Sequence, residues 1–136
     1  MTKTNLLEQD GHWVLPLVAE VVVQCRYDYA LTLVVRELDP YEVRISEPFT
    51  LYNPDGTVGV FDPEGDPRKM GASLRLLRHT VTRAIAHKDG RLEIDFDDGS
   101  CLRVPAGDHY EAWDLAGPEG ALMVSIPGGD LAVWSE

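Results

Sequence analysis

Two Asp-Gly pairs, at positions 89–90 and 98–99, interrupt the stretch TVTRAIAHKDGRLEIDFDDGSCLRVP. Asp-Gly between alternating runs is among the strongest short-range signals for a β-hairpin, because the central residues of the tight turn adopt positive φ. Between the two turns, Leu92, Ile94 and Phe96 alternate with acidic residues, which is typical of a strand with one buried face. The stretch therefore predicts consecutive antiparallel hairpins.

The same period of two extends over most of the chain. Asn-Pro-Asp-Gly at 53–56 predicts a further turn, since proline presets φ and glycine accepts positive φ. We expect Trp113 and Trp134 to anchor the core, as buried tryptophans commonly do. Two further runs have one apolar phase that we expect to face inward: Val21, Val23 and Cys25 in the first, and Leu122, Val124 and Ile126 in the second.

The period changes once, in the middle of the chain. Met70, Leu74 and Leu77 recur at i, i+4 and i+7, which places them on one helical face. Asp66 precedes a proline and is suited to cap the helix, because proline is favoured at the first helical position. The sequence therefore predicts a single helix over about 67–78.

Together these elements predict an α+β, mainly β protein. We expect an antiparallel meander sheet, rolled or layered, with about nine or ten short strands and the one helix. The length of 136 residues is that of a single domain, 1–136, large enough to bury its own core.

Charge narrows the classes of partner. The chain has 23 acidic and 12 basic residues and a net charge of -11. A surface this negative repels phosphate, so we expect no nucleic acid and no membrane as a partner. There is no apolar run near 18 residues and no signal-peptide pattern at the N-terminus, so we expect a cytoplasmic protein.

Few residues form a pattern typical of catalysis or cofactor binding. No histidine is paired with another at i+4, and the sequence has no EF-hand, nucleophile elbow or phosphate-binding loop. Cys25 and Cys101 are far apart and belong to no C-x-x-C pair, so we expect two free thiols. His79, at the predicted helix end, is expected to be structural, because a cation is favoured there. We predict no catalytic residue, no metal site and no cofactor.

Two groups of residues are candidates for binding. His109, Glu111 and Asp114 follow Asp108 closely, and an Asp-His pair can orient a general base. Adjacent residues of a strand point to opposite faces, so we do not expect residues 108 and 109 to pair, and whether this cluster lines a groove is open.

The second group is basic: Arg68, Arg75 and Arg78 fall on one face of the predicted helix. Residues 89–119 are by contrast rich in acids. One of these two surfaces is a candidate docking site for an opposite charge.

The pattern DGRLEIDFDDGSCLRVP…HYEAWDLAGPEG…VSIPGGDLAVW resembles that of a family of small, uncharacterised, mainly actinobacterial proteins. The recurrent features of the family are D-G-x-L-x-[IL]-x-F-x-D-G, then E-x-W, then P-G-G before an aromatic residue. The strand and turn pattern is also similar to some small immunity proteins of bacterial toxin systems. The resemblance implies a fold type and a bacterial cytosolic setting, and brings no known catalytic residue. The matching residues here are Asp89, Gly90, Leu92, Phe96, Asp98, Gly99, Glu111, Trp113, Pro127, Gly128, Gly129 and Trp134.

Three functional hypotheses follow. The first is a non-enzymatic module that binds another protein or associates with itself, and in a sharper form an immunity-type inhibitor of a basic toxin. The second is a small-ligand binder or enzyme that uses the cluster from Asp108 to Asp114. The third is a homodimer whose edge strands pair.

Overall fold

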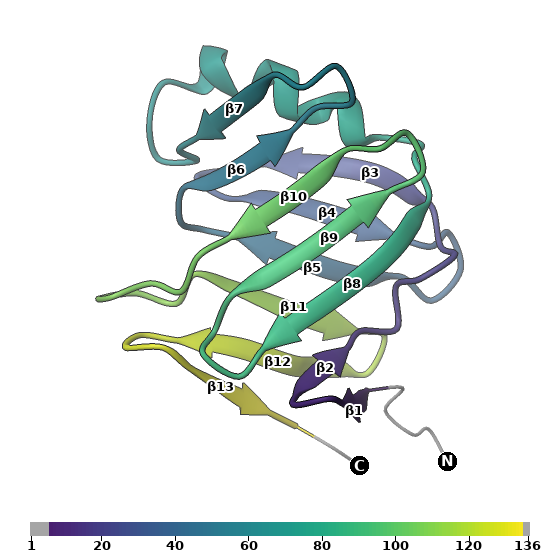
Figure 1. Ribbon diagram of the computed structural model, residues 1–136, viewed down its shortest axis with the longest axis vertical. Helices are drawn as coiled ribbons and strands as arrows, with labels where there is room; N and C mark the ends of the chain where they lie inside the picture. The colour runs from purple at the N-terminus through teal and green to yellow at the C-terminus, as the bar shows by residue number, and fades with distance from the viewer. Residues whose placement is uncertain (1–5, 135–136) are drawn as a thin grey trace.

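The alternating runs form two antiparallel β-sheets that pack face to face, and the computed structural model describes them over residues 6–134 (Figure 1). The seven-stranded sheet has the order β1 (Leu7–Gln9), β2 (His12–Val14), β8 (Val81–His87), β9 (Leu92–Phe96), β10 (Cys101–Val104), β6 (Phe49–Tyr52) and β7 (Val58–Phe61). The six-stranded sheet has the order β13 (Asp130–Val133), β12 (Gly120–Ile126), β11 (Trp113–Gly117), β5 (Tyr41–Ile45), β4 (Leu31–Val35) and β3 (Val22–Tyr27).

The core lies between the two sheets. From the seven-stranded sheet, Leu92, Ile94 and Phe96 of β9 are buried as expected, and β10 adds Leu102 and Val104. The six-stranded sheet contributes apolar side chains of β4, β5 and β11 to the same cluster. The class expected from the sequence, mainly β with layered antiparallel sheets and one helix, is therefore confirmed.

The described residues form 13 strands, more than the nine or ten expected. Part of this difference in strand number arises at residues 41–52, because their sequence alternates like a single strand although they form two. The chain there crosses from β5 to β6, which belong to different sheets, around Glu47 and Pro48. β1 has only three residues, too few for a recognisable alternation.

The helix is confirmed, but its period was predicted wrongly. Element η1 (Pro67–Leu76) is a 3-10 helix, and its buried residues are Met70, Ser73 and Leu76, at a spacing of three. Ser73 donates its hydroxyl to the carbonyl oxygen of Met70 at 2.6 Å. Leu74, expected to be inward, is exposed. Asp66 caps the helix as predicted and accepts a hydrogen bond from the backbone N–H of residue 68.

Three other expectations about side-chain direction are wrong. In β3 a bulge between Val22 and Gln24 changes the phase, so Val22 is buried while the flanking valines are exposed. In β12 the buried residues are Met123 and Ser125. Trp113 is buried as expected, but the side chain of Trp134 is 49% exposed. Valine and leucine on both phases make the inward phase ambiguous from sequence.

Candidate functional site

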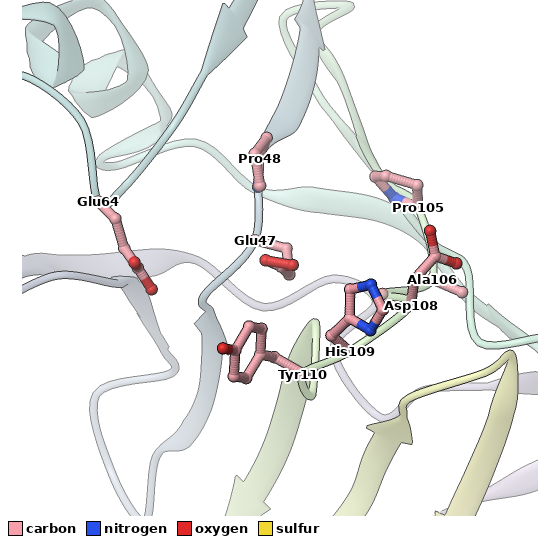
Figure 2. A pocket seen from close by; sticks show the side chains of 9 residues that line it. Glu47, Pro48, Glu64, Pro105, Ala106, Asp108, His109 and Tyr110 are labelled. Atoms are coloured by element: carbon pink, nitrogen blue, oxygen red, sulfur yellow. The ribbon is translucent and has the colours of Figure 1, made fainter.

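A hollow of about 590 Å³ lies where three connecting segments meet, and we call it the acidic pocket. Glu47 and Pro48 join β5 to β6, Glu64 lies between β7 and η1, and residues 105–110 belong to the long connection from β10 to β11. Figure 2 shows the side chains of Glu47, His109 and Tyr110 near the middle of this hollow, with that of Glu64 on one side.

The wall of the acidic pocket is shaped by backbone contacts. The backbone N–H groups of residues 46 and 47 both donate to the carbonyl oxygen of Ala112, which ties the two connections together. Gly107 has no side chain, and a Cβ at this position would collide with the carbonyl oxygen of Tyr110. The carbonyl oxygen of Gly107 also accepts a hydrogen bond from the N–H of Gly128, which anchors the loop to the β12–β13 turn.

The charge of the acidic pocket is negative and uncompensated. Its lining residues include the carboxylates of Glu47, Glu64 and Asp108, and no lysine or arginine. None of the ion pairs of the described residues involves these three carboxylates. Tyr110 places a ring beside them that is 72% exposed. Three carboxylates and an open aromatic ring form a site suited to a cation.

The cluster expected from Asp108 to Asp114 is divided by the structure. Asp108 and His109 line the acidic pocket, whereas Glu111 and Asp114 are outside its lining. Residues 108–110 lie in a loop, so the strand alternation that we used to separate Asp108 from His109 does not apply. Among the described residues no hydrogen bond joins His109 to a carboxylate.

Asp114 lies instead in the middle of the six-stranded sheet. It pairs across the strands with Arg44 of β5 and Val124 of β12. Burial raises the pKa of Asp114; the Arg44 guanidinium opposes this shift, and the negative charges of Glu111 and Glu42 add to it. Asp114 is therefore a half-buried acidic residue on a charged face of the six-stranded sheet, away from the acidic pocket.

The three arginines do not form one helix face, because a 3-10 helix turns 120° per residue and ends before Arg78. Arg68 forms an ion pair with its own capping residue, Asp66, at 2.9 Å. Arg75 donates to Asn53 Oδ1 at 3.0 Å and lies 3.6 Å from Asp98 Oδ2. Arg78 lines a separate groove beside β3.

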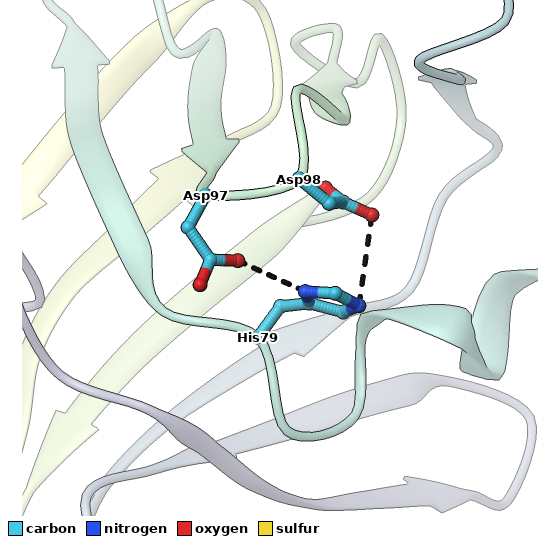
Figure 3. Close-up of side chains that lie close together, drawn as sticks. All are labelled: His79, Asp97 and Asp98. Atoms are coloured by element: carbon cyan, nitrogen blue, oxygen red, sulfur yellow. Dashed lines mark hydrogen bonds and ion pairs between the residues drawn. The ribbon is translucent and has the colours of Figure 1, made fainter.

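His79 was expected to stabilise the helix end, but it lies three residues beyond Leu76 and contacts the β9–β10 turn. Its Nδ1 is 2.9 Å from Asp97 Oδ1, and its Nε2 is 3.6 Å from Asp98 Oδ2 (Figure 3). The hydrogen bond with His79 holds the pKa of Asp97 below its usual value.

The ligand-type atoms of these three side chains lie within 4.8 Å of one another, so this is a group that could hold a metal ion. Burial alone would raise the pKa of Asp98, but hydrogen bonds from Ser100 and the nearby His79 and Arg75 lower it overall. The carboxylate of Asp98 is thus already surrounded by donors. The cluster of His79, Asp97 and Asp98 thus connects the segment that follows η1 to the β9–β10 turn.

The two cysteines are free, as expected from the sequence. Burial raises the pKa of the Cys25 thiol. Burial and the neighbouring Asp95 carboxylate raise the pKa of the Cys101 thiol, and Arg103 offsets this only in part. Both thiols are therefore poor nucleophiles near neutral pH, because the thiolate is the reactive form.

No helix in the part of the chain that the structure describes is long and apolar enough to cross a membrane. No curated protein and no solved structure matches the chain. One family model does match, over residues 13–135, and its description is a family of unknown function (DUF6188). The matched range begins at Trp13 of β2 and includes all later strands, the acidic pocket and the groove that Arg78 lines. The chain therefore belongs to the DUF6188 family.

Proposed function

We propose that this protein is a non-enzymatic interaction module whose acidic pocket receives a basic segment of a partner protein. The observation that supports it most is the set of three unpaired carboxylates, Glu47, Glu64 and Asp108, around one hollow. A lysine or arginine side chain that enters this hollow would meet negative charge without having to displace an existing cation.

The rim of the acidic pocket suits a protein partner. Tyr110 is a large, exposed aromatic residue, and aromatic residues are enriched in protein interfaces, where arginine commonly stacks on them. Pro48 and Pro105 restrict the backbone on two sides of the hollow, so less conformational entropy is lost when a partner binds. The net charge of -11 would also accelerate the approach of a basic partner.

A direct test uses a fluorescently labelled peptide of alternating arginine and glycine, titrated with the protein near physiological salt. The pocket variant E64Q/D108N removes two of the three lining carboxylates and keeps Glu47. The control variant D10N/D39N removes the same amount of charge from two turn residues outside the pocket. Both control positions have positive φ, which asparagine adopts readily.

We expect the pocket variant to weaken peptide binding at least tenfold and the control variant to weaken it less than twofold. Equal losses in both variants would mean that the peptide binds to the acidic surface in general, and the proposal would fail. Saturable binding that is unchanged in the pocket variant would also overturn it. Circular dichroism melts of each variant verify that the fold is retained.

The sharper form of the proposal is an immunity-type inhibitor, in which the acidic pocket covers a basic toxin. The same three carboxylates support it, since nucleases and other toxins that act on nucleic acid carry basic surfaces. Gene order provides the test, because toxin and immunity genes are adjacent. A toxin gene beside this gene in many relatives is the expected result, and its consistent absence would exclude this form while leaving the interaction module intact.

A further inference from the structure

A second hollow, the Arg78 groove, has about the same volume as the acidic pocket, about 580 Å³, but a different charge. It lies along the edge strand β3 of the six-stranded sheet, at the place where the chain after η1 reaches that strand. Its lining residues are Val21, Val22, Val23, Gln24, Val34, Arg36, Glu37 and Arg78.

Two arginines reach this groove from different parts of the fold. Arg36 follows β4, and its backbone N–H donates to the carbonyl oxygen of Val21 at 2.9 Å. Arg78 follows η1, and its backbone N–H donates to the carbonyl oxygen of Val22 at 2.7 Å. Both have positive φ, 77° and 74°, which is unusual for residues other than glycine. The carbonyl groups of Val21 and Val22, at the start of β3, therefore hold both arginines in conformations that the surrounding structure has to stabilise.

The two guanidinium groups differ in their contacts. Arg36 donates to the carbonyl oxygens of Leu38 and Asp39, lies over the ring of Tyr41 and is 3.8 Å from Glu20. Arg78 and Lys69 are, among the lysines and arginines that the structure describes, the two that form no ion pair. Arg78 lines this groove, and the exposed Glu37 lines the same groove without pairing with it.

Exposed apolar side chains lie beside this unpaired cation. Val21 and Val23 are 38% and 39% exposed, although β-branched residues in strands are usually covered on one face. Val23 is the extra residue of the β3 bulge and faces no residue of β4. A cation next to an apolar surface at a sheet edge complements an extended peptide that alternates acidic and apolar side chains.

We propose that the Arg78 groove binds an acidic, apolar segment of a partner protein, with one carboxylate on the Arg78 guanidinium and apolar side chains on Val21 and Val23. This site is separate from the acidic pocket and takes the opposite charge, so either site can fail without affecting the other. The net charge of -11 opposes the approach of any acidic peptide, and binding would therefore depend on the local cation rather than on the overall field.

The test uses a labelled synthetic peptide with the sequence Val-Asp-Val-Asp-Val, with binding measured by fluorescence anisotropy and by backbone amide shifts in NMR. The matched pair of variants is Arg78→Gln and Lys69→Gln. Each removes one cation that forms no ion pair among the described residues, so the change in net charge is the same and no ion pair is broken. Arg78→Lys keeps the charge but loses the planar fork, and Val23→Thr keeps the shape but adds a hydroxyl.

We expect Arg78→Gln to weaken binding at least tenfold, Lys69→Gln less than twofold, and both Arg78→Lys and Val23→Thr by an intermediate factor. The amide shifts should concentrate on residues 21–24 and 78. Equal losses in the two glutamine variants would mean non-specific attraction and would overturn the proposal. Failure of the unsubstituted protein to bind the peptide saturably at millimolar peptide concentration would also overturn the proposal. Thermal melts of each variant verify that it is folded.

Discussion

The indole N–H of Trp113, in the six-stranded sheet, donates to the carbonyl oxygen of Gly90, in a turn of the seven-stranded sheet, at 2.8 Å. Gly90 lies in the turn between β8 and β9, while Trp113 begins β11. The hydroxyl of Ser125 donates to the same oxygen at 2.9 Å. One Asp-Gly turn of the seven-stranded sheet is thus held by two buried donors of the six-stranded sheet.

The first prediction concerns these two donors. Trp113→Phe and Ser125→Ala should each destabilise the protein by at least about 1 kcal/mol, because each removes a buried hydrogen bond. The double variant should cost more than the sum, since the buried carbonyl oxygen of Gly90 then has neither side-chain donor. Urea denaturation of the four proteins measures this coupling, and strict additivity would contradict the prediction by showing that the two hydrogen bonds contribute independently to stability.

The second prediction compares two glycines of the two Asp-Gly turns. Gly90 and Gly99 both have positive φ, 97° and 91°, so alanine strains either backbone by about 1 kcal/mol. At position 90 a Cβ would also lie 3.0 Å from Ser125 Oγ and from the Cβ of Ala106, whereas at position 99 its closest contact is at 3.7 Å. Gly90→Ala should therefore lower the melting temperature clearly more than Gly99→Ala, and equal effects would contradict the proposed close contact between the sheets.

The third prediction concerns pH and the His79 cluster. Because the pKa of Asp97 is lowered in the folded protein, its carboxylate stabilises the fold above the unfolded pKa, and this contribution is lost as pH falls through the lowered pKa. Asp97→Asn should therefore be less stable than the natural protein at pH 7. The difference in stability should shrink as the pH falls through the lowered pKa of Asp97.

Denaturation curves at pH 7 and at a series of lower pH values test the third prediction. Asp10→Asn is the control, because Asp10 lies in an exposed turn and forms no ion pair among the described residues. A gap between Asp97→Asn and the natural protein that stays constant with pH would mean that the hydrogen bond from His79 does not favour the charged carboxylate.

The fourth prediction concerns the reactivity of Cys101. Since burial and the Asp95 carboxylate raise the pKa of this thiol, removing that charge should increase the thiolate fraction. Alkylation by iodoacetamide at pH 8 should be faster in Asp95→Asn than in the parent protein, both measured in a Cys25→Ser background. Asp97→Asn is the matched control in the turn that directly follows the same strand, and an equal acceleration there would point to a general loss of structure.

The candidate site was only partly predictable from the sequence. His109 was singled out because of its acidic neighbours, and it does line the acidic pocket. Glu47 and Glu64 lie in different connections, 62 and 45 positions before His109 respectively, so no local pattern could bring them to it. The sequence singled out Arg78 as part of a basic helix face, but the helix ends before this residue. The position of Arg78 beside β3 depends instead on the hydrogen bond from its backbone N–H to the carbonyl oxygen of Val22.

The sequence alone determined the hairpins at Asp-Gly 89–90 and 98–99, the Asp66 cap and the inward face of β9. Each of these depends on residues within a few positions of one another. The tertiary structure decided the rest. The packing of the two sheets decides which phase of β3 and of β12 is buried. It also decides where the chain crosses from β5 in one sheet to β6 in the other. Segments such as residues 20–25 have apolar residues on both phases, so their direction is set by what the opposite sheet can cover and not by their own pattern.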